Sequence, residues 1–372
     1  MVLWLTHVFP YYARQGVACK FAGQKSYNVC VQILENIPLK DHSTMRLGGT
    51  ARYAVEVTSR QDVAEAAAWA ESHNLPMLMI GTGSNIVWKD EGFSGLLLIN
   101  NIKRFELFDE DGQNFYLTVG GGETWDEVVK RAVDESLTGI EALSLIPGTA
   151  GAAPVQNIGA YGQELADTLT TIEAYDVQTK QFVTIPGSDC NFGYRASRFK
   201  YADRGRFFIT AITLHLTRGL PEPPFYKAVE DYLKEHSETR PTPQTIRDAV
   251  IAIRTSKLPD PKVIANNGSF FANPIVEESA VVQLLADYPD MPYWRVDANH
   301  VKIPAGWLVD QVGLKGYHDE ETGMATWDLQ ALVFVNEHAR RTADLLKFRQ
   351  KITDAVQTKF GIALEQEPEL LP

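Results

Sequence analysis

The sequence predicts an α+β protein in which two blocks of alternating strands and helices are followed by a third domain of α+β type. Three observations lead to this fold class. The chain has 372 residues, of which 45% are hydrophobic, so it can form two or three domains with their own cores. Up to about residue 217, strand-like segments alternate with segments of helical spacing. Beyond a proline-rich stretch, helical spacing dominates.

The first block contains a β-α-β unit. Residues 52–57 alternate like a strand, residues 61–74 repeat apolar side chains at helical spacing, and residues 75–80 are typical of a buried strand. This strand leads into GTGSN, residues 81–85, where two glycines allow backbone amides to approach a ligand closely. A tight turn is the alternative interpretation of this loop. A further strand is predicted around residues 95–100.

The second block begins with a strand at residues 115–120 and a helix at residues 124–136. Thr124 and Glu127 have the spacing of a capping box at the start of that helix. The helix is followed by the loop IPGTAGAAPVQNIGAYG, residues 146–162, which is longer and richer in glycine and alanine than a surface turn requires. Loops of this length are usually functional when they are ordered.

Together the two glycine-containing loops predict one large cofactor with phosphate groups, clamped between the two blocks. Backbone amides exposed by small residues can solvate a pyrophosphate, and Gln156 and Asn157 can hydrogen-bond the edge of a heterocycle. Neither GxGxxG nor GxxxxGK[ST] is present, so the sequence lacks the fingerprints of Rossmann dinucleotide binding and of P-loop NTPases.

The rest of the chain is predicted to complete the second block and to form the third domain. A hairpin is expected through residues 171–177 and 181–185, and a strand at 207–217. GLPEPP, residues 219–224, is predicted to be a linker because its prolines stiffen it and end the strand. Three further segments have helical spacing: 241–257, 277–288 and 342–360.

Composition narrows the range of partners and compartments. With 35 basic and 47 acidic residues, the net charge of -12 opposes broad attraction to nucleic acid or to anionic membranes, so neither is predicted as a partner.

Cys19, Cys30 and Cys190 form no CxxC pair, and no metal site is expected. A reducing cytoplasm fits best. The first 16 residues lack the cationic start of a signal peptide, and no protein partner or oligomeric state can be inferred.

Seven stretches in the same order resemble the UDP-N-acetylenolpyruvoylglucosamine reductase family, which completes UDP-N-acetylmuramate for bacterial peptidoglycan. The resemblance runs from about residue 37 to the C-terminus. The matching stretches are HSTMRLGG (42–49), GTGSN (81–85), the loop 146–162, CNFGYRASRFK (190–200), RTSKLPDPK (254–262), NNGSFFANP (266–274) and AGWLVDQVGLKG (305–316).

The resemblance implies a two-subdomain FAD-binding fold of the vanillyl-alcohol-oxidase type, followed by an α+β substrate-binding domain. The implied FAD-binding subdomains are residues 37–100 and 101–218, the substrate domain is 225–372, and residues 1–36 are an N-terminal extension. It also implies the chemistry: NADPH reduces FAD, and the reduced flavin gives hydride to the enolpyruvyl methylene of the nucleotide sugar. A proton must then reach the adjacent carbon.

Three residues match the family's catalytic positions. Arg195 matches the arginine that stabilises charge developing near the substrate carboxylate, although composition alone would favour a surface ion pair. Ser269 matches the proton donor; without the resemblance it would be assigned to capping a turn. The third is a C-terminal glutamate. A gapless alignment selects Glu367, while strand geometry alone does not separate it from Glu365 or Glu369.

Four further residues match positions that bind the substrate diphosphate: Tyr226, Lys257, Asn273 and Lys315. A tyrosine hydroxyl, an amide and two ammonium groups suit a dianion. For FAD, the resemblance implies contacts from Gly81, Gly83, Ser84, Asn85, Pro147, Gly151, Gln156, Asn157, Gly159, Ala160 and Tyr161.

The sequence also departs from the family at two places near these positions. Ala152 and Ala153 stand where many relatives have one or two serines, so a hydroxyl contact to the cofactor is missing or is replaced by a backbone amide. After Glu367, relatives often have a hydrophobic residue and an arginine, whereas this chain has Pro368 and Glu369. A flavin contact from an arginine at that position is therefore in doubt.

Two other functions remain as alternatives at this stage. One is an FAD oxidase of a small alcohol or lactone on the same fold, and the other is a flavin- or nucleotide-sugar-binding protein without turnover. Intact Arg195, Ser269 and an acidic C-terminal tail argue against the loss of catalysis. The sequence does not distinguish NADPH from NADH as the electron donor.

Overall fold

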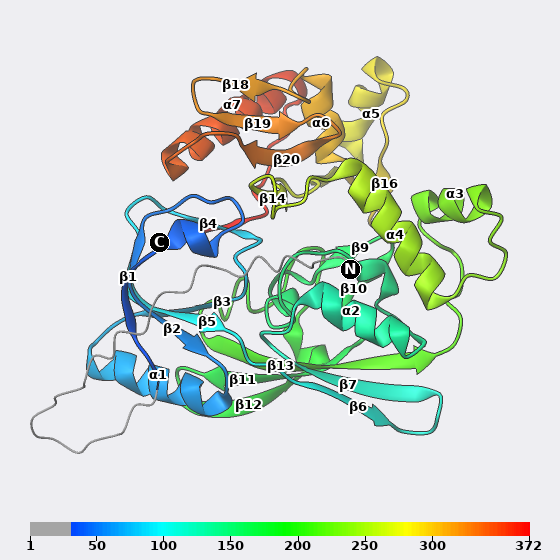
Figure 1. Cartoon of the computed structure of the whole chain (residues 1–372). Helices are drawn as coiled ribbons and strands as arrows, with labels where there is room; N and C mark the ends of the chain where they lie inside the picture. The colour runs from blue at the N-terminus through cyan, green and yellow to red at the C-terminus, as the bar shows by residue number, and fades with distance from the viewer. Residues whose placement is uncertain (1–30) are drawn as a thin grey trace, which may run out of the picture.

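The computed structural model describes residues 31–372, and Figure 1 shows their arrangement. Two subdomains built on sheets lie in the lower part of Figure 1, and the third domain lies above them. The predictions for residues 1–30, including Cys19 and Cys30, lie outside the described residues.

The first subdomain is a four-stranded mixed sheet covered by one helix. β2 and β3 both run parallel to β5, which lies between them, while β1 runs antiparallel to β2. Helix α1 (Arg60–Ser72) starts at a capping box formed by Ser59 and Asp62 and buries Val63 and Ala66 against the sheet. The predicted β-α-β unit is confirmed. The strands, in sheet order, are β1 (Leu34–Pro38), β2 (Thr50–Val57), β5 (Phe93–Asn100) and β3 (Met77–Ile80).

The second subdomain is a six-stranded antiparallel sheet with helix α2 (Trp125–Asp134) packed into its core. The predicted hairpin and the long strand after it are confirmed as β11, β12 and β13. The strand order is β12 (Gln181–Pro186), β11 (Leu169–Asp176), β13 (Phe207–Arg218), β7 (Asn114–Gly120) and β6 (Phe105–Asp109), with β8 (Leu137–Thr138) also paired to β13.

The predicted capping box at the start of α2 is wrong. Thr124 is the N-cap residue, but its side chain accepts no capping hydrogen bond. Its backbone instead forms a bridge with Thr149, and the Trp125 amide donates to the Gly148 carbonyl at 3.1 Å. The long loop therefore fixes the start of the helix through the backbone.

The third domain combines a four-stranded antiparallel sheet, a three-stranded sheet and three helices around an aromatic core. Phe270, Phe334 and Phe348 are fully buried there, and the ring centroids of the first two are 4.4 Å apart. The helices are α5 (Glu278–Asp287), α6 (Ala305–Gln311) and α7 (Thr342–Phe360). The strands are β14 (Asn266–Ser269), β20 (Gln330–Asn336), β19 (Met324–Trp327) and β18 (His318–Asp319) in one sheet, and β15 (Ile275–Glu277), β17 (His300–Lys302) and β16 (Trp294–Arg295) in the other.

Helices α3 (Lys227–Glu235) and α4 (Pro243–Lys257) follow the predicted linker but pack against the second subdomain. Their apolar side chains surround Ala142, and α4 lies beside α2 (Figure 1). Arg247 of α4 is 5% exposed and bonds Asp126 of α2 at 2.7 Å and the Ser144 hydroxyl at 2.8 Å. The chain thus returns to the second subdomain before it enters the core of the third domain.

The first subdomain and the third domain share one apolar core. Met45, Leu47 and Val87 pack in the same cluster as Phe270 and Phe348. The C-terminal strand β21 (Glu369–Leu371) runs parallel to β4 (Ile86–Trp88) and so returns the end of the chain to the first subdomain. A short hairpin of β9 (Gly159–Ala160) and β10 (Gln163–Glu164) completes the strands.

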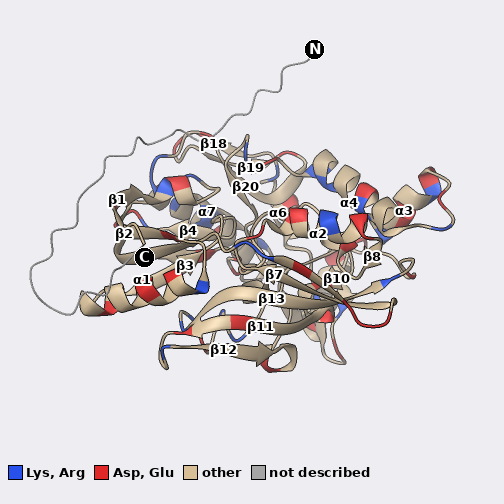
Figure 2. Cartoon of the chain, turned by 60° about the horizontal axis from the view of Figure 1, so that its bottom comes forward, with Lys and Arg blue, Asp and Glu red and all other residues tan. Residues whose placement is uncertain are grey.

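Acidic and basic side chains are interspersed along the helices and loops in the view of Figure 2. The net charge of -12 is therefore not gathered on one face in this view. Within residues 31–372, no helix combines the length and apolar character needed to cross a bilayer.

Asp90 of the first subdomain caps helix α7 of the third domain, which has no side-chain cap of its own. Its two carboxylate oxygens accept from the Thr342 amide at 2.7 Å and the Ala343 amide at 3.0 Å. A carboxylate at a helix N-terminus satisfies free amides and complements the helix dipole. This contact joins the two parts of the chain.

We predict that Asp90→Ala lowers the free energy of unfolding by about 1 kcal/mol, the usual cost of losing a cap. The urea midpoint, followed by tryptophan fluorescence, measures it. Glu91→Ala is the matched control because the neighbouring side chain is exposed. Equal midpoints for the two variants would contradict the capping role.

Candidate active site

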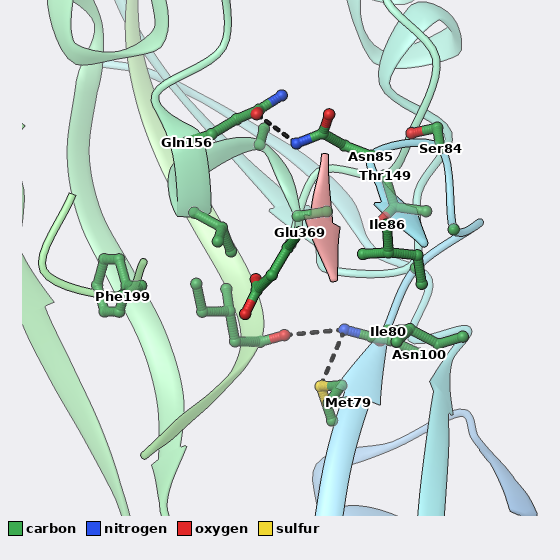
Figure 3. Close-up of a pocket in the computed structure, with 18 of the residues that line it drawn as sticks. Met79, Ile80, Ser84, Asn85, Ile86, Asn100, Thr149, Gln156, Phe199 and Glu369 are labelled. Atoms are coloured by element: carbon green, nitrogen blue, oxygen red, sulfur yellow. Dashed lines mark hydrogen bonds between the residues drawn. The ribbon is translucent and has the colours of Figure 1, made fainter. Parts of the chain in front are cut away.

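The two loops predicted to hold a cofactor meet and form one cavity. The Ser84 hydroxyl donates to the Pro147 carbonyl at 3.1 Å, and the Asn85 amide donates to the Gln156 side chain (Figure 3). At the other end of the cavity, Asn100 of β5 donates to the Ile209 carbonyl of β13 at 2.8 Å. Each contact joins the first subdomain to the second.

The cavity encloses about 1400 Å³, including space open to solvent, and has mostly apolar walls. Its walls come from both subdomains, which suits an extended cofactor that contacts both. Seven of the residues predicted to bind the cofactor line it: Gly81, Gly83, Ser84, Asn85, Pro147, Gly151 and Gln156.

Local geometry supports a phosphate-bearing cofactor in this cavity. A Cβ at Gly81 would lie 2.3 Å from the Thr149 hydroxyl, and a Cβ at Gly83 would lie 2.1 Å from the His42 carbonyl, so only glycine fits at either position. The Thr149 hydroxyl lines the cavity and is buried without a hydrogen-bond partner among the described residues. A buried hydroxyl without a partner is costly, so it suits a ligand contact.

Four other predicted cofactor residues do not line the cavity: Asn157, Gly159, Ala160 and Tyr161. The Asn157 side chain is fully buried, donates to the Gly193 carbonyl at 3.2 Å and accepts from the Ala166 amide at 3.0 Å. The Gly159 carbonyl accepts from Arg195 at 2.8 Å. This end of the loop supports the neighbouring arginine, and a direct cofactor contact from these four residues stays a prediction.

Arg195 and Glu367 form a partly buried ion pair beside the cavity. Arg195 has a positive φ of 53°, in a tight turn closed by hydrogen bonds between Gly193 and Ala196. Its Nε atom lies 3.1 Å from Glu367 Oε1, yet this buried Nε makes no aligned hydrogen bond. Burial raises the pKa of the Glu367 carboxyl, while the positive charges of Arg195 and Lys200 oppose that rise.

Glu367 also differs from the two other tail glutamates. Its side chain is 11% exposed and lines the cavity, whereas Glu365 is exposed and does not line it. Glu369 lines the cavity as well but pairs with Arg204. Of the three, Glu367 is the one that meets Arg195.

The C-terminal tail runs antiparallel to the segment that follows Ser269, so Glu367 lies opposite Phe270, the residue after the serine. The Glu367 amide donates to the Phe270 carbonyl at 2.9 Å, and the Ala272 amide donates to the Glu365 carbonyl at 3.0 Å. Ser269 itself faces a second pocket, in the third domain. The serine and the glutamate therefore lie on neighbouring backbone segments and line different pockets, Ser269 the second pocket and Glu367 the cofactor cavity.

Asn267 fixes this strand to the first cofactor loop. Its amide nitrogen lies within hydrogen-bonding distance of three acceptors: the Ser84 and Ile86 carbonyls, both at 3.2 Å, and the Thr44 hydroxyl at 3.1 Å. Gly268, which follows, has a positive φ of 71° with open space where a Cβ would point. Backbone conformation, rather than a crowded neighbour, therefore accounts for this glycine.

The second pocket contains two of the four residues predicted to bind the diphosphate, Asn273 and Lys315. The Asn273 oxygen accepts from the Ala305 amide at 2.9 Å, and its side chain also interacts with Tyr194. Tyr226 and Lys257 lie outside this pocket and are exposed. Tyr226 instead packs edge-on against Tyr161, with 5.6 Å between ring centroids.

Sequence reasoning missed several polar residues around Arg195. Lys200 lines the cofactor cavity and Tyr194 interacts with Asn273; both lie within CNFGYRASRFK, so the motif contained the signal. The Lys302 ammonium lies 4.4 Å from the Tyr194 ring centroid. Burial lowers the pKa of Lys302, and the charge of Arg195 adds to this. No sequence pattern pointed to Lys302.

Comparison with known proteins agrees with this geometry. The model of an FAD binding domain matches residues 51–183, and the model of the C-terminal domain of UDP-N-acetylenolpyruvoylglucosamine reductase matches residues 260–371. The fold and the cavity therefore define an FAD-dependent oxidoreductase with a separate substrate domain.

The chain belongs to the UDP-N-acetylenolpyruvoylglucosamine reductase family. It is 40% identical to the enzyme of that name from Ralstonia nicotianae, over 90% of this chain and 98% of the relative. It is 37% identical to the Chromobacterium violaceum enzyme, over 92% and 99% of the two chains. The crystal structure of the enzyme from Thermus caldophilus shares the fold, with a TM-score of 0.63 at 23% identity over 92% of this chain and all of that one. The predicted fold class and FAD are confirmed, and the family favours the reductase over the alternative oxidase.

One charged network anchors the segment 200–206, which forms part of the cavity wall. Asp176, 2% exposed, accepts two hydrogen bonds from Arg206, at 2.8 and 3.1 Å. Arg206 also reaches Asp203, and Asp203 pairs with Arg198. The hydrogen bonds from Arg206 lower the pKa of Asp176 from 3.8 to about 2.

We predict that Asp176→Asn lowers the free energy of unfolding by about 2 kcal/mol at pH 6, since each pKa unit is worth about 1.4 kcal/mol. Because the folded-state pKa is depressed, the stabilisation is present above the unfolded pKa of 3.8 and is lost as the pH falls toward 2. The difference from the wild type should fall to about half by pH 3 in urea titrations. Asp134→Asn on the exposed face of α2 is the control, and a pH-independent deficit for Asp176→Asn would refute the linkage.

Proposed function

We propose that this chain reduces UDP-N-acetylglucosamine enolpyruvate to UDP-N-acetylmuramate for peptidoglycan synthesis, with NADPH as co-substrate. One arrangement supports the proposal: Glu367, which lines the cofactor cavity, pairs with Arg195, and its amide donates to the carbonyl of Phe270, which directly follows Ser269 of the second pocket. Bound FAD supplies the hydride for the enolpyruvyl methylene and is recharged by NADPH. The protein has to supply position, charge and a proton.

Arg195 is proposed to stabilise the negative charge that develops on the substrate. Hydride addition beside a carboxylate produces an enolate-like species, and a fixed cation close to it lowers the barrier. Besides the ion pair of its Nε with Glu367 and its hydrogen bond to the Gly159 carbonyl, the guanidinium has further N–H groups that can donate to a substrate carboxylate. The hydrogen bond from Arg195 to the Gly159 carbonyl fixes the orientation of the planar guanidinium group.

Ser269 is proposed to deliver the proton to the carbon adjacent to the methylene. A hydroxyl is a weak acid, but a carbanion-like centre is a strong base, and general acid catalysis of this kind is worth ~100 to 10,000-fold. No hydrogen bond of the Ser269 hydroxyl occurs among the described residues. Glu367, whose pKa burial raises, is bonded through its amide to the carbonyl of the next residue, Phe270, and is proposed as the third catalytic group.

Asn273 and Lys315 are proposed to bind the substrate diphosphate within the second pocket. Tyr226 and Lys257 would join them only where the substrate extends toward α3 and α4. The division into subdomains at residues 37–100 and 101–218 and a substrate domain at 225–372 is part of the proposal. A cytoplasmic location is proposed as well, because the cysteine pattern and the acidic composition support it.

We predict that Ser269→Ala leaves the reduction of FAD by NADPH intact but slows the reduction of the nucleotide sugar by the reduced flavin. The purified variant should keep yellow FAD that NADPH bleaches at the wild-type rate, because the serine has no role in that step. When the enolpyruvyl nucleotide sugar is added without oxygen, the colour should return ~100 to 10,000-fold more slowly than in the wild type. Stopped-flow absorbance measures both rates.

Ser279→Ala is the matched control, since Ser279 is an exposed serine of the same domain. It should behave like the wild type in both halves. Wild-type recolouring of Ser269→Ala would eliminate the proton-donor role. A wild-type protein that is bleached by NADPH but never recoloured by the nucleotide sugar would eliminate the proposed substrate.

A further inference from the structure

One ion pair joins two walls of the cofactor cavity, and both of its members line the cavity. Arg204 belongs to the second subdomain, in the segment anchored by Asp176 and Arg206. Glu369 belongs to the C-terminal tail, and in Figure 3 its side chain extends into the space between the walls. The Arg204 guanidinium is paired with the Glu369 carboxylate.

Both residues are held by backbone contacts independent of their pairing. The Glu369 amide donates to the Asn85 carbonyl at 3.0 Å, and Glu369 aligns with Ile86 in the pairing of β21 with β4. The Arg204 amide donates to the Tyr201 carbonyl at 3.2 Å. The pair therefore lies beside GTGSN, the loop whose amides suit a pyrophosphate.

The other charged residues lining the cavity already have partners. Asp203 is paired with Arg198 and Arg206, Glu367 lies against Arg195, and the Lys200 ammonium donates to the Arg195 carbonyl. Arg204 is different because its side chain is 55% exposed and has Glu369 as its only side-chain partner among the described residues. A guanidinium carries five N–H groups, so most of its donors remain free.

We propose that Arg204 binds the diphosphate of FAD, and that Glu369 is the partner that orients this guanidinium. Arginine matches phosphate geometry through two parallel hydrogen bonds, which makes it suited to this task. The phosphate and Glu369 then compete for one cation, because both are anionic. This inference requires FAD binding but not the proposed substrate, so FAD affinity tests it without turnover.

The test is the dissociation constant of FAD for full-length apoprotein, measured by quenching of flavin fluorescence. Arg204→Gln should weaken binding at least about tenfold, because a charged hydrogen bond to phosphate is lost. Glu369→Gln should leave binding unchanged or tighten it, because the competing carboxylate is gone. The double variant should resemble Arg204→Gln.

An ion pair that only ties the two walls together would give a different pattern. Both single variants would then weaken FAD binding equally, and the double variant would be no weaker than either one. That symmetric result, or an unchanged affinity of Arg204→Gln, overturns the proposal. Melting of each apoprotein verifies that it is folded. Lys130→Gln and Asp134→Asn, which remove an exposed ion pair on α2, are the controls and should leave FAD affinity unchanged.

Discussion

The active site depends on one costly arrangement, the burial of the Glu367 carboxyl beside Arg195. Taking a carboxylate out of water costs several kcal/mol unless a charge and hydrogen bonds compensate it. The compensating charges, Arg195 and Lys200, come from the second subdomain, while the Glu367 backbone is held by the Phe270 carbonyl of the third domain. The tail that carries Glu367 then continues into β21, which pairs with β4 of the first subdomain. The pair therefore forms only when all three parts are assembled.

The same assembly explains why the two pockets can work together. Asn267 fixes the serine-bearing strand to the first glycine loop, and Asp90 fixes helix α7 to the same subdomain. Met45 and Val87 extend the core of the third domain into the first. Catalytic groups gain most from such fixed positions when a misplacement of about one ångström would slow the reaction, because their orientation is then set before the substrate binds.

Local patterns predicted the elements, and the contacts between distant segments were not predictable. The periodic segments became α1, α4 and α7 close to the expected bounds because their spacing matches the faces that they bury. The failed capping box had correct spacing, but the backbone of the long loop occupies that helix start. The docking of α3 and α4 depends on the bond between Arg247 and Asp126, which are 121 positions apart and belong to no common motif.

The site residues divide in the same way. Motif matching selected Arg195 and Glu367, and the structure pairs them across two segments that are far apart in the sequence. It also selected Asn157, whose side chain bonds the Gly193 carbonyl and the Ala166 amide. That side chain supports the turn that carries Arg195, and a cofactor contact from Asn157 stays a prediction.

The departures from the family pattern concern hydroxyl and cationic groups at the cavity wall, and in both cases a neighbouring element offers the missing group. Ala152 has no hydroxyl, but Thr149, three residues earlier in the same loop, places a buried and unpartnered hydroxyl at the cavity. At Glu369, where the family resemblance predicts an arginine, Arg204 from the opposite wall brings a cation to the carboxylate. The interaction energy between a cofactor and a charged group depends on their distance and surroundings, and not on which segment of the chain carries the group. In a cavity built from two loops and a tail, a hydroxyl or a cation can therefore reach the same point of the wall from a different segment of the chain.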